Sequence, residues 1–388
     1  MDMVTACRRT MYSVLMLVVF LFHEPSQTYG ENFCCPDNEC YSMDPPWRSV
    51  FRPVPNPTCV DDVEFLLFTR SNPGIPFNTS MKNMSLDGSY YSAGKATVIL
   101  LSGWLMRIDG KPWASVGPAI LSNVDANVIY ANYSYVTSNI NYPQVVSDIR
   151  RLATLVCKFV SYLIDEKGVS KNKIHLVGMS LGSHVASYVG KCINDLGRIT
   201  GLDPAGPLFN GFNCTIHLCK GDAQFVDAIH TNGNPVWGFG THTENNDVDI
   251  NMNGGWDQPL CGVPDKNTIP NITAGNYTSM DILKTFMCSH LRAIYYYVEA
   301  LRNRNCTFWG QPANMVKMHV SRNTLGYGTK LVVDSATCTN ETCAAIKLDI
   351  ASTERGQFIV ATNYLEPYCV SAPEQEGGIF NSLMSILP

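Results

Sequence analysis

The most constraining feature of the sequence is a regular alternation of short apolar runs with amphipathic stretches between residues 97 and 230. The apolar runs have the length of buried strands. They are 97–101 (TVILL), 127–130 (NVIY), 173–178 (KIHLVG), 198–203 (RITGLD) and 224–230 (QFVDAIH). Strands that alternate with helices imply a mostly parallel sheet with helices on both faces. We therefore expect an α/β fold.

The clearest helix lies between Pro143 and Gly168, where apolar residues recur at steps of 4, 3, 4, 3 and 4. This spacing places them on one helix face. They are Val145, Ile149, Leu152, Val156, Phe159 and Leu163. Proline near the start and glycine just past the end are typical helix boundaries.

A second helix is expected after the 173–178 strand, to about Asp195. Beyond Leu301, short β-like runs predict a disulfide-tied β extension of the same domain.

Composition excludes several classes of protein. The chain has 388 residues, of which 45% are hydrophobic and only 16% charged, so it is not a disordered chain. The net charge is −5 and Lys and Arg form no dense cluster, so nucleic acid is not expected as a partner. No repeat with a period of roughly 20 to 50 residues occurs, which excludes solenoids and propellers.

The first thirty residues have the pattern of a secretory signal. Arg8 and Arg9 precede an apolar run over 11–22, which is followed by a polar stretch over 23–30. The apolar run is shorter than the roughly twenty residues that a membrane-spanning helix needs. We therefore expect a secreted, extracellular protein without a transmembrane segment after signal removal.

Cysteine and asparagine patterns agree with secretion. The chain has fifteen cysteines, and fourteen remain once Cys7 of the signal is set aside, an even number that predicts a disulfide framework. No paired C-x-x-C sites with histidine partners occur, so zinc is not expected.

Eight N-x-S/T sequons are candidate glycosylation sites. They are Asn78, Asn83, Asn132, Asn213, Asn271, Asn276, Asn305 and Asn340.

A G-x-S-x-G motif over 178–182 follows the 173–178 strand and precedes a helical pattern. A tight strand-to-helix turn of this kind holds the serine oxygen above the sheet edge, where a substrate carbonyl can reach it. The same letters also occur in ordinary glycine-serine turns. The position directly after a buried strand favours the interpretation of Ser180 as a nucleophile.

A serine nucleophile needs a base, and the base needs a carboxylate that orients it. On sheets of this type the chain order is serine, acid, histidine. Asp203 closes the next strand and precedes Pro204, which places it where that strand meets the active edge. Asp222, in a loop bracketed by cysteines, and Asp227, in mid-strand, are the competing acids.

Five histidines follow the candidate acid. His290 comes two residues after Cys288 and opens an expected helix over 291–301, so a disulfide and a helix start would both fix its backbone. His230 ends an apolar strand and is equally compatible with a structural role. His184, in the helix after the serine, is interpreted as a packing residue. The remaining three, without positioning signals, are His217, His242 and His319.

The oxyanion that forms in acyl transfer needs two backbone N–H donors. Leu181, directly after the serine, is expected to supply one. Trp104, in the loop Ser102-Gly103-Trp104 after the first central strand, is expected to supply the other, and its indole can flank an acyl chain. The alternative is that Trp104 is simply a core aromatic residue.

Together these motifs resemble the pancreatic-lipase family of secreted α/β hydrolases, especially its insect-type lipase and phospholipase A1 branch. The similarity runs from about Cys40 to Cys369. Its segments are 63–73 (VEFLLFTRSNP), 177–184 (VGMSLGSH), 198–207 (RITGLDPAGP), 225–233 (FVDAIHTNG), 253–261 (NGGWDQPLC), 288–293 (CSHLRA) and 356–369. The resemblance implies the α/β-hydrolase fold with a disulfide-tied C-terminal β extension, and the triad Ser180, Asp203 and His290.

The resemblance also implies that residues 262–287 form a lid, closed at its base by a Cys261–Cys288 disulfide. Three departures from the family pattern matter. The usual His-Gly-aromatic oxyanion loop reads Ser102-Gly103-Trp104. The acidic run that holds a structural calcium in digestive members is replaced around 214–222, so we expect no metal and no other cofactor. The β-sandwich that digestive members use for colipase has no counterpart, so colipase is not expected as a partner.

We expect a signal over 1–30, one lipase domain over 31–372 and a short tail over 373–388. The expected function is a secreted serine carboxylic ester hydrolase that cleaves acyl esters of lipids at an interface through an acyl-enzyme. Triacylglycerol lipase and phospholipase A1 are both compatible with the sequence. The alternative is a catalytically silent lipid-binding member, like the yolk proteins that share the fold.

Overall fold

The computed structural model describes residues 32–261, 279–313, 317–323, 326–332, 338, 342–347 and 355–370. For 279–286 and 317–332 it describes the backbone but not the side chains. The predicted signal (1–30), most of the predicted lid (262–278) and the predicted tail (373–388) lie outside the described residues.

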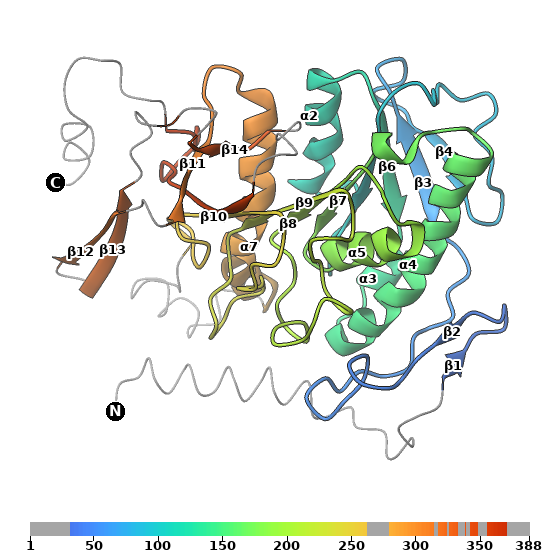
Figure 1. The fold of residues 1–388 in the computed structure, drawn as a ribbon, viewed down its shortest axis with the longest axis horizontal. Helices are drawn as coiled ribbons and strands as arrows, with labels where there is room; N and C mark the ends of the chain where they lie inside the picture. Colours follow the sequence, from blue (N-terminus) through green and yellow to red (C-terminus); the bar gives the residue numbers. More distant parts are fainter. Residues whose placement is uncertain are drawn as a thin grey trace.

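The fold is built on an eleven-stranded sheet with the order β14-β11-β15-β10-β9-β8-β7-β5-β6-β3-β4 (Figure 1). Seven neighbouring strands are parallel, namely β15 (Gly356–Val360), β10 (Val248–Met252), β9 (Phe225–His230), β8 (Arg198–Leu202), β7 (Ile174–Met179), β5 (Thr97–Leu101) and β6 (Asn127–Asn132). Antiparallel strands flank them, namely β3 (Glu64–Phe68), β4 (Phe77–Ser80), β11 (Trp309–Pro312) and β14 (Ala344–Ala345). This order confirms the expected mostly parallel sheet and places β7, which leads to Ser180, near its middle.

Helices cover both faces of the sheet (Figure 1). The helices α4 (Tyr142–Asp165) and α5 (Leu181–Ile193) pack on one face, and α2 (Val116–Asn123) and α7 (Ser279–Arg302) on the other. Successive strand residues point to opposite faces, so in β5 Ile99 joins the α4–α5 core and Leu100 joins the α2–α7 core. Each side chain of this size contributes roughly 1.5–3 kcal/mol when fully buried.

Short elements complete the architecture. They are the 3₁₀ helices η1 (Trp113–Ser115) and η2 (Lys171–Lys173), the helix α3 (Ser134–Thr137), and two small hairpins outside the main sheet, β1 (Phe33–Cys34) with β2 (Cys40–Tyr41) and β12 (Lys317–Asn323) with β13 (Gly326–Val332). The strands β11, β14 and β15 form the expected C-terminal β extension, and they continue the main sheet. A disulfide between Cys306 and Cys369 joins the two ends of this extension.

The long helix α4 begins and ends as its sequence predicts. The Asn141 side chain accepts a hydrogen bond from the Gln144 backbone N–H at 3.4 Å and so caps the first turn, which contains Pro143. Gly168, three residues past the end of the helix, has a φ of 72°. Glycine adopts this left-handed conformation readily, and it therefore allows the chain to turn back toward the sheet.

One predicted helix boundary is wrong. The helix expected over 291–301 begins at Ser279, so His290 lies inside α7 rather than at its start, and the last residues of the predicted lid are helical. The apolar positions Ile282, Leu283, Phe286 and Met287 follow the spacing of one helix face, and they continue the pattern of the residues after His290. The Cys261–Cys288 disulfide therefore does not mark the start of the helix, because Cys288 lies within α7.

Seven disulfides pair all fourteen cysteines that follow the predicted signal. They are Cys34–Cys40, Cys35–Cys59, Cys157–Cys192, Cys214–Cys219, Cys261–Cys288, Cys306–Cys369 and Cys338–Cys343. The expected disulfide framework is therefore present.

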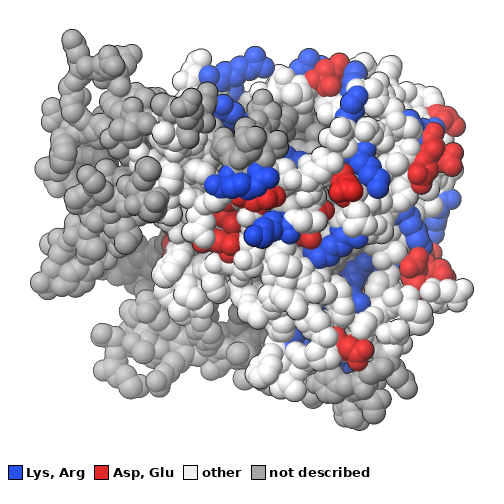
Figure 2. All heavy atoms as spheres, in the orientation of Figure 1, with Lys and Arg blue, Asp and Glu red and all other residues white. Residues whose placement is uncertain are grey.

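In the part of the chain that the structure describes, no helix is both long and apolar enough to cross a membrane. On the face drawn in Figure 2, basic and acidic side chains are intermixed rather than gathered into one basic patch.

Candidate active site

Ser180 lies in the tight turn between β7 and α5, and its backbone has φ 56° and ψ −121°. A positive φ is strained for a residue other than glycine, and such strain is typical of functional turns. The turn requires close backbone contacts, because a Cβ at Gly182 would lie 2.0 Å from the Leu101 carbonyl oxygen. The Ser180 N–H donates to the Leu202 carbonyl at 3.0 Å, which places the serine beside the end of β8.

Asp203 follows β8 directly and is completely buried. Its Oδ1 accepts hydrogen bonds from the backbone N–H groups of Thr231 at 2.7 Å and Asn232 at 3.0 Å, just past the end of β9. Its Oδ2 lies 2.5 Å from Nδ1 of His290. The two backbone donors thus fix the carboxylate and leave its second oxygen for the imidazole.

His290 reaches this edge of the sheet from α7 and is 2% exposed. The Phe239 ring lies at 5.9 Å from the imidazole, centroid to centroid. Because Nδ1 donates to Asp203, Nε2 is the nitrogen that remains for exchange of a proton with a nucleophile. The structure therefore brings Asp203 and His290 together at the edge of the sheet where Ser180 lies.

The predicted oxyanion donors lie on either side of the serine turn. Leu181 is the first residue of α5, where a backbone N–H has no acceptor within the helix. Gly103, next to Trp104, packs so closely on the serine that an added Cβ would lie 2.7 Å from the Ser180 Cβ. This contact places the loop 102–104 against Ser180.

The loop 102–104 begins with serine, and contacts from a neighbouring segment anchor it. The Ser102 carbonyl accepts a hydrogen bond from the Tyr133 hydroxyl at 2.9 Å, and the Leu105 N–H donates to the Thr137 carbonyl at 2.8 Å. The Trp104 indole is half-buried and donates to the Asn139 carbonyl at 2.7 Å. The loop is thus held by the segment between β6 and α4.

The competing acids make other pairs. Asp227 is buried in an ion pair with Arg198 at 2.7 Å, as its mid-strand position suggested. Asp222 is buried in an ion pair with Lys191 at 2.7 Å. Neither carboxylate is recorded in contact with His290, whose described carboxylate partner is Asp203.

The competing histidines also have other partners. Nε2 of His230 donates to Asp249 Oδ1 at 2.8 Å, and both residues are buried. The ring nitrogens of His217 lie 2.8 Å and 2.9 Å from the carbonyl oxygens of Leu218 and Phe212. His242 is exposed, and the side chain of His319 lies outside the described part of the structure.

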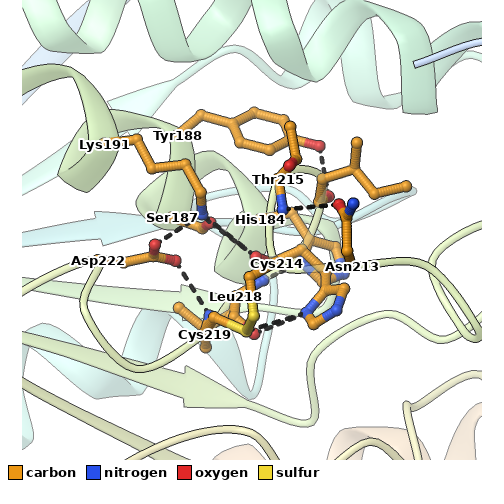
Figure 3. A network of polar contacts seen from close by, with 12 residues as sticks. His184, Ser187, Tyr188, Lys191, Asn213, Cys214, Thr215, Leu218, Cys219 and Asp222 are labelled. Carbon is orange, nitrogen blue, oxygen red and sulfur yellow. Dashed lines mark hydrogen bonds and ion pairs between the residues drawn. A yellow bond between two sulfur atoms is a disulfide. The ribbon is translucent and has the colours of Figure 1, made fainter. Parts of the chain in front are cut away.

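His184 packs as predicted, within a polar network that anchors the helix carrying Ser180 (Figure 3). Its Nε2 lies 2.8 Å from the Ala205 carbonyl, and its Nδ1 accepts from the Leu218 N–H at 3.2 Å. Burial lowers the pKa of His184 to about 3, so the ring is neutral at physiological pH and is a poor general base.

Lys191 and Ser187 extend this network along α5 toward the Cys214–Cys219 hairpin (Figure 3). Lys191 bridges Asp222 at 2.7 Å and the Ser187 hydroxyl at 2.5 Å, and Ser187 donates to the His217 carbonyl at 3.1 Å. Burial lowers the pKa of Lys191 and raises that of Asp222, while the opposite charge of each partner offsets part of the effect. The helix is thus fixed to the hairpin by charge as well as by packing.

This hairpin also holds one cluster of side chains with metal-ligating chemistry, Cys214, His217 and Cys219. The two sulfur atoms are joined in a disulfide. A disulfide offers no thiolate, which is the form of cysteine that binds metal. The cluster therefore does not fit a metal site.

Apolar side chains are exposed in the segments that surround His290. Trp256 is 57% exposed and Leu260 is 68% exposed. The Trp256 carbonyl accepts a hydrogen bond from Asn232, whose backbone holds Asp203. These exposed side chains thus belong to the segment that is hydrogen-bonded to the residues around Asp203.

Sequence reasoning missed the groups that orient the acid. Thr231 and Asn232 act through backbone N–H groups, and Gln258 holds their segment by donating to the Thr231 carbonyl at 2.9 Å. The segments 225–233 and 253–261 had been noted only as family motifs. Their position after β9 and β10, at the edge that holds Ser180, was the signal that could have identified them.

Comparison with known proteins identifies the family. A family model described as "Lipase" matches residues 31–368. The chain is 32% identical over 299 residues to human pancreatic lipase-related protein 3, covering 74% of this chain and 62% of that protein. It is 32% identical to the pancreatic triacylglycerol lipase of Myocastor coypus (71% and 61% covered) and 30% identical to phospholipase A1 member A of Rattus norvegicus (82% and 68% covered). The chain thus spans about six-tenths of the length of the first two relatives. The chain belongs to the pancreatic lipase family.

Proposed function

We propose that the protein is a serine carboxylic ester hydrolase that cleaves acyl esters of lipids, with Ser180, Asp203 and His290 as its catalytic triad. The observation that carries the proposal is the buried Asp203–His290 pair, with 2.5 Å between Oδ2 and Nδ1, at the edge where Ser180 occupies a strained turn. Aspartate that orients the base for a serine nucleophile is the arrangement that acyl transfer requires.

In the proposed mechanism, Nε2 of His290 takes the proton of Ser180 as Oγ attacks the acyl carbonyl carbon. The imidazolium is stabilised by Asp203, and it returns the proton to the leaving alcohol oxygen as the ester bond breaks. Water then attacks the acyl-enzyme with His290 again as the base, which releases the fatty acid and restores Ser180.

The negative charge on the substrate oxygen is proposed to be held by the backbone N–H groups of Leu181 and Trp104. Donors that are already fixed stabilise a developing oxyanion without reorganisation, and removal of one such donor typically costs about 10²- to 10³-fold in turnover. The Gly103–Ser180 contact and the anchored loop support this assignment because they hold Trp104 beside the nucleophile.

Lipid esters are proposed as substrates for two reasons. Relatives that cover most of this chain are named as a triacylglycerol lipase and a phospholipase A1. Exposed apolar residues, including Trp256 and Leu260, lie in the segment that precedes Cys261.

We also propose that the protein is secreted and glycosylated, since a disulfide framework of this size is typical of oxidising compartments. A loss of mass on treatment of the secreted protein with a glycosidase would support this.

The test is product analysis on mixed emulsions of triacylglycerol and phosphatidylcholine, with a soluble fluorogenic ester as a second substrate. Wild-type protein should release fatty acid from at least one lipid, and Ser180→Ala protein should release none above background. The products identify the preferred lipid and the position of the cleaved ester. Absence of hydrolysis of every ester by well-folded wild-type protein would favour a lipid-binding protein instead.

A further inference from the structure

Strand β3 has apolar side chains on both faces, but they are not equally covered. Phe65 and Leu67 are fully buried in the core beneath α4 and α5. Leu66 and Phe68, on the opposite face, are only half-buried. Strands with apolar residues on both faces are usually covered on both. The α2 side of this end of the sheet is thus partly open.

A groove of about 500 Å³ lies at this place, between β3, β6, α2 and the loop before η1. Its apolar lining includes Leu66, Phe68, Ile108, Leu121 and Tyr130. The volume is within the roughly 300–1,000 Å³ that is typical of pockets for small molecules. Neither the groove lining nor its neighbours include any member of the proposed triad.

The polar groups on the floor of the groove are satisfied by the protein. The Tyr130 hydroxyl accepts from the Gly117 N–H at 2.8 Å and donates to the Ala114 carbonyl at 3.3 Å, so both of its hydrogen-bonding roles are filled. Asp109 also lines the groove, and both of its carboxylate oxygens accept from Arg107, at 2.9 Å and 2.8 Å. The negative charge in this groove is therefore already paired.

Arg70 also lines the groove, and its positive charge, unlike the negative charge of Asp109, has no ion-pair partner among the described residues. Its Nε donates to the carbonyl of Leu121 in α2 at 2.8 Å, which fixes the guanidinium at the groove. Among the described residues, its two terminal nitrogens have no hydrogen-bond or ion-pair partner, and the side chain is exposed. The two N–H groups on that edge match the geometry of a carboxylate, which they can bind in a bidentate manner.

We propose that this groove is a second lipid site, which binds a long-chain fatty acid with its alkyl chain along Leu66, Phe68 and Leu121 and its carboxylate on Arg70. An apolar groove with one unpaired cation is complementary to a single-chain anion. The inference rests on the proposed function only in taking the fatty acid to be the product that the protein releases. The binding itself requires no catalysis.

The test measures binding of cis-parinaric acid by fluorescence, with the full chain carrying Ser180→Ala so that no ester is cleaved. Laurate and methyl laurate serve as competitors. On this background, Arg70→Gln should weaken laurate binding to the groove by about tenfold or more, since hydrogen bonds to charged groups are among the stronger ones. It should leave methyl laurate unchanged, because the methyl ester has no carboxylate. Ser122→Phe, which places a large ring at the groove wall, should weaken both.

A matched control is Arg302→Gln. Arg302 is also exposed and also donates to a carbonyl of the α2 region, that of Ser115 at 3.4 Å, but it does not line the groove. The Arg302→Gln variant should change the affinity for laurate by less than about twofold, which is the range of ordinary surface substitutions. Equal losses for laurate and methyl laurate with Arg70→Gln, or no loss with either groove variant, would overturn the proposal. Tight binding of lysophosphatidylcholine but not laurate would also overturn it.

Discussion

The molecule contains two buried His–Asp pairs, and only one of them belongs to the proposed triad. His290 and Asp203 lie 2.5 Å apart, and His230 and Asp249 lie 2.8 Å apart. Both histidines are 2% exposed. The residue types, the burial and the contact are thus nearly the same. The difference lies in the position of each aspartate relative to its strand, because Asp203 follows β8 and Asp249 lies within β10.

Asp203 follows the last residue of β8, has a φ of 43° and is held by backbone N–H groups from beyond β9. Asp249 lies inside β10, where it accepts hydrogen bonds from the backbone and side chain of Asn246. Only the first pair is thereby placed past the carboxyl ends of the strands, where ligands bind in open α/β sheets. We infer that position at the sheet edge, rather than the pair itself, confers the catalytic role.

The largest effect is expected from the nucleophile and base. Ser180→Ala and His290→Ala should each lower kcat by roughly 10⁴- to 10⁶-fold, and the double variant should lose little more, because triad members act as a unit. The measurement is steady-state hydrolysis of a soluble ester, with near-ultraviolet circular dichroism as a folding control. Losses that add in the double variant would contradict this assignment.

The second prediction compares the two carboxylates directly. Asp203→Asn should lower kcat by about 10⁴-fold, as expected when the orienting acid of a triad is lost. Asp249→Asn is the matched control, and it should lower kcat by less than about tenfold because it orients a histidine that is not the base. Similar losses in the two variants would show that sheet-edge position is not the deciding difference.

The third prediction concerns the stability that the His230 pair supplies. Burial lowers the pKa of His230, but the hydrogen bond and charge of Asp249 outweigh it, so the pKa is raised overall. Protonated His230 therefore stabilises the fold most below the unfolded-state pKa of about 6.5, and this contribution is lost as pH rises through the folded-state pKa.

His230→Gln should accordingly reduce the free energy of unfolding by about 1–3 kcal/mol at acid pH and by less at pH 9. The measurement is urea unfolding of wild type and variant at both pH values. A destabilisation that grows with pH would mean that His230 is neutral in the folded protein.

The smallest effect is expected from chelation. The proposed mechanism assigns proton transfer to the His290–Asp203 pair. It assigns stabilisation of the oxyanion to backbone donors, which do not require a cation. Activity and Tm should therefore be unchanged in EDTA, as measured by ester hydrolysis and calorimetry. A loss that added calcium restores would show that a metal, as well as the protein's own pairs, maintains the site.

The sequence predicted the parallel strands best where their pattern is purely apolar. β5 was expected over Thr97–Leu101 and is observed there. β10 was missed because its sequence, VDINM, contains Asp249 and Asn251, which look unsuited to burial. Their burial depends on partners elsewhere in the chain, since Asp249 contacts His230 and Asn251 donates to Glu244 at 2.6 Å.

The site residues, like the strands, were easier to predict where the signal lies in consecutive residues than where it depends on distant parts of the chain. Ser180 was found from five consecutive residues, whereas His290 was selected by chain order and a cysteine although its helix was placed wrongly. The donors that orient Asp203 are backbone groups, whose role is set by how β8 and β9 end side by side. No side-chain pattern encodes them.

The contact between Gly103 and Ser180 has a consequence for how such an enzyme can change. A Cβ at position 103 would meet both the serine Cβ and, at 2.8 Å, the Met179 carbonyl, so any side chain there displaces the nucleophile. Positions 102 and 104 already have side chains, a buried serine and a half-buried tryptophan, so a Cβ fits at both. We therefore expect variation in the loop at its two outer residues, while the middle one is fixed as glycine by the turn beneath it. A library randomised at 102 and 104 should yield enzymes with altered acyl selectivity, and one randomised at 103 should return glycine.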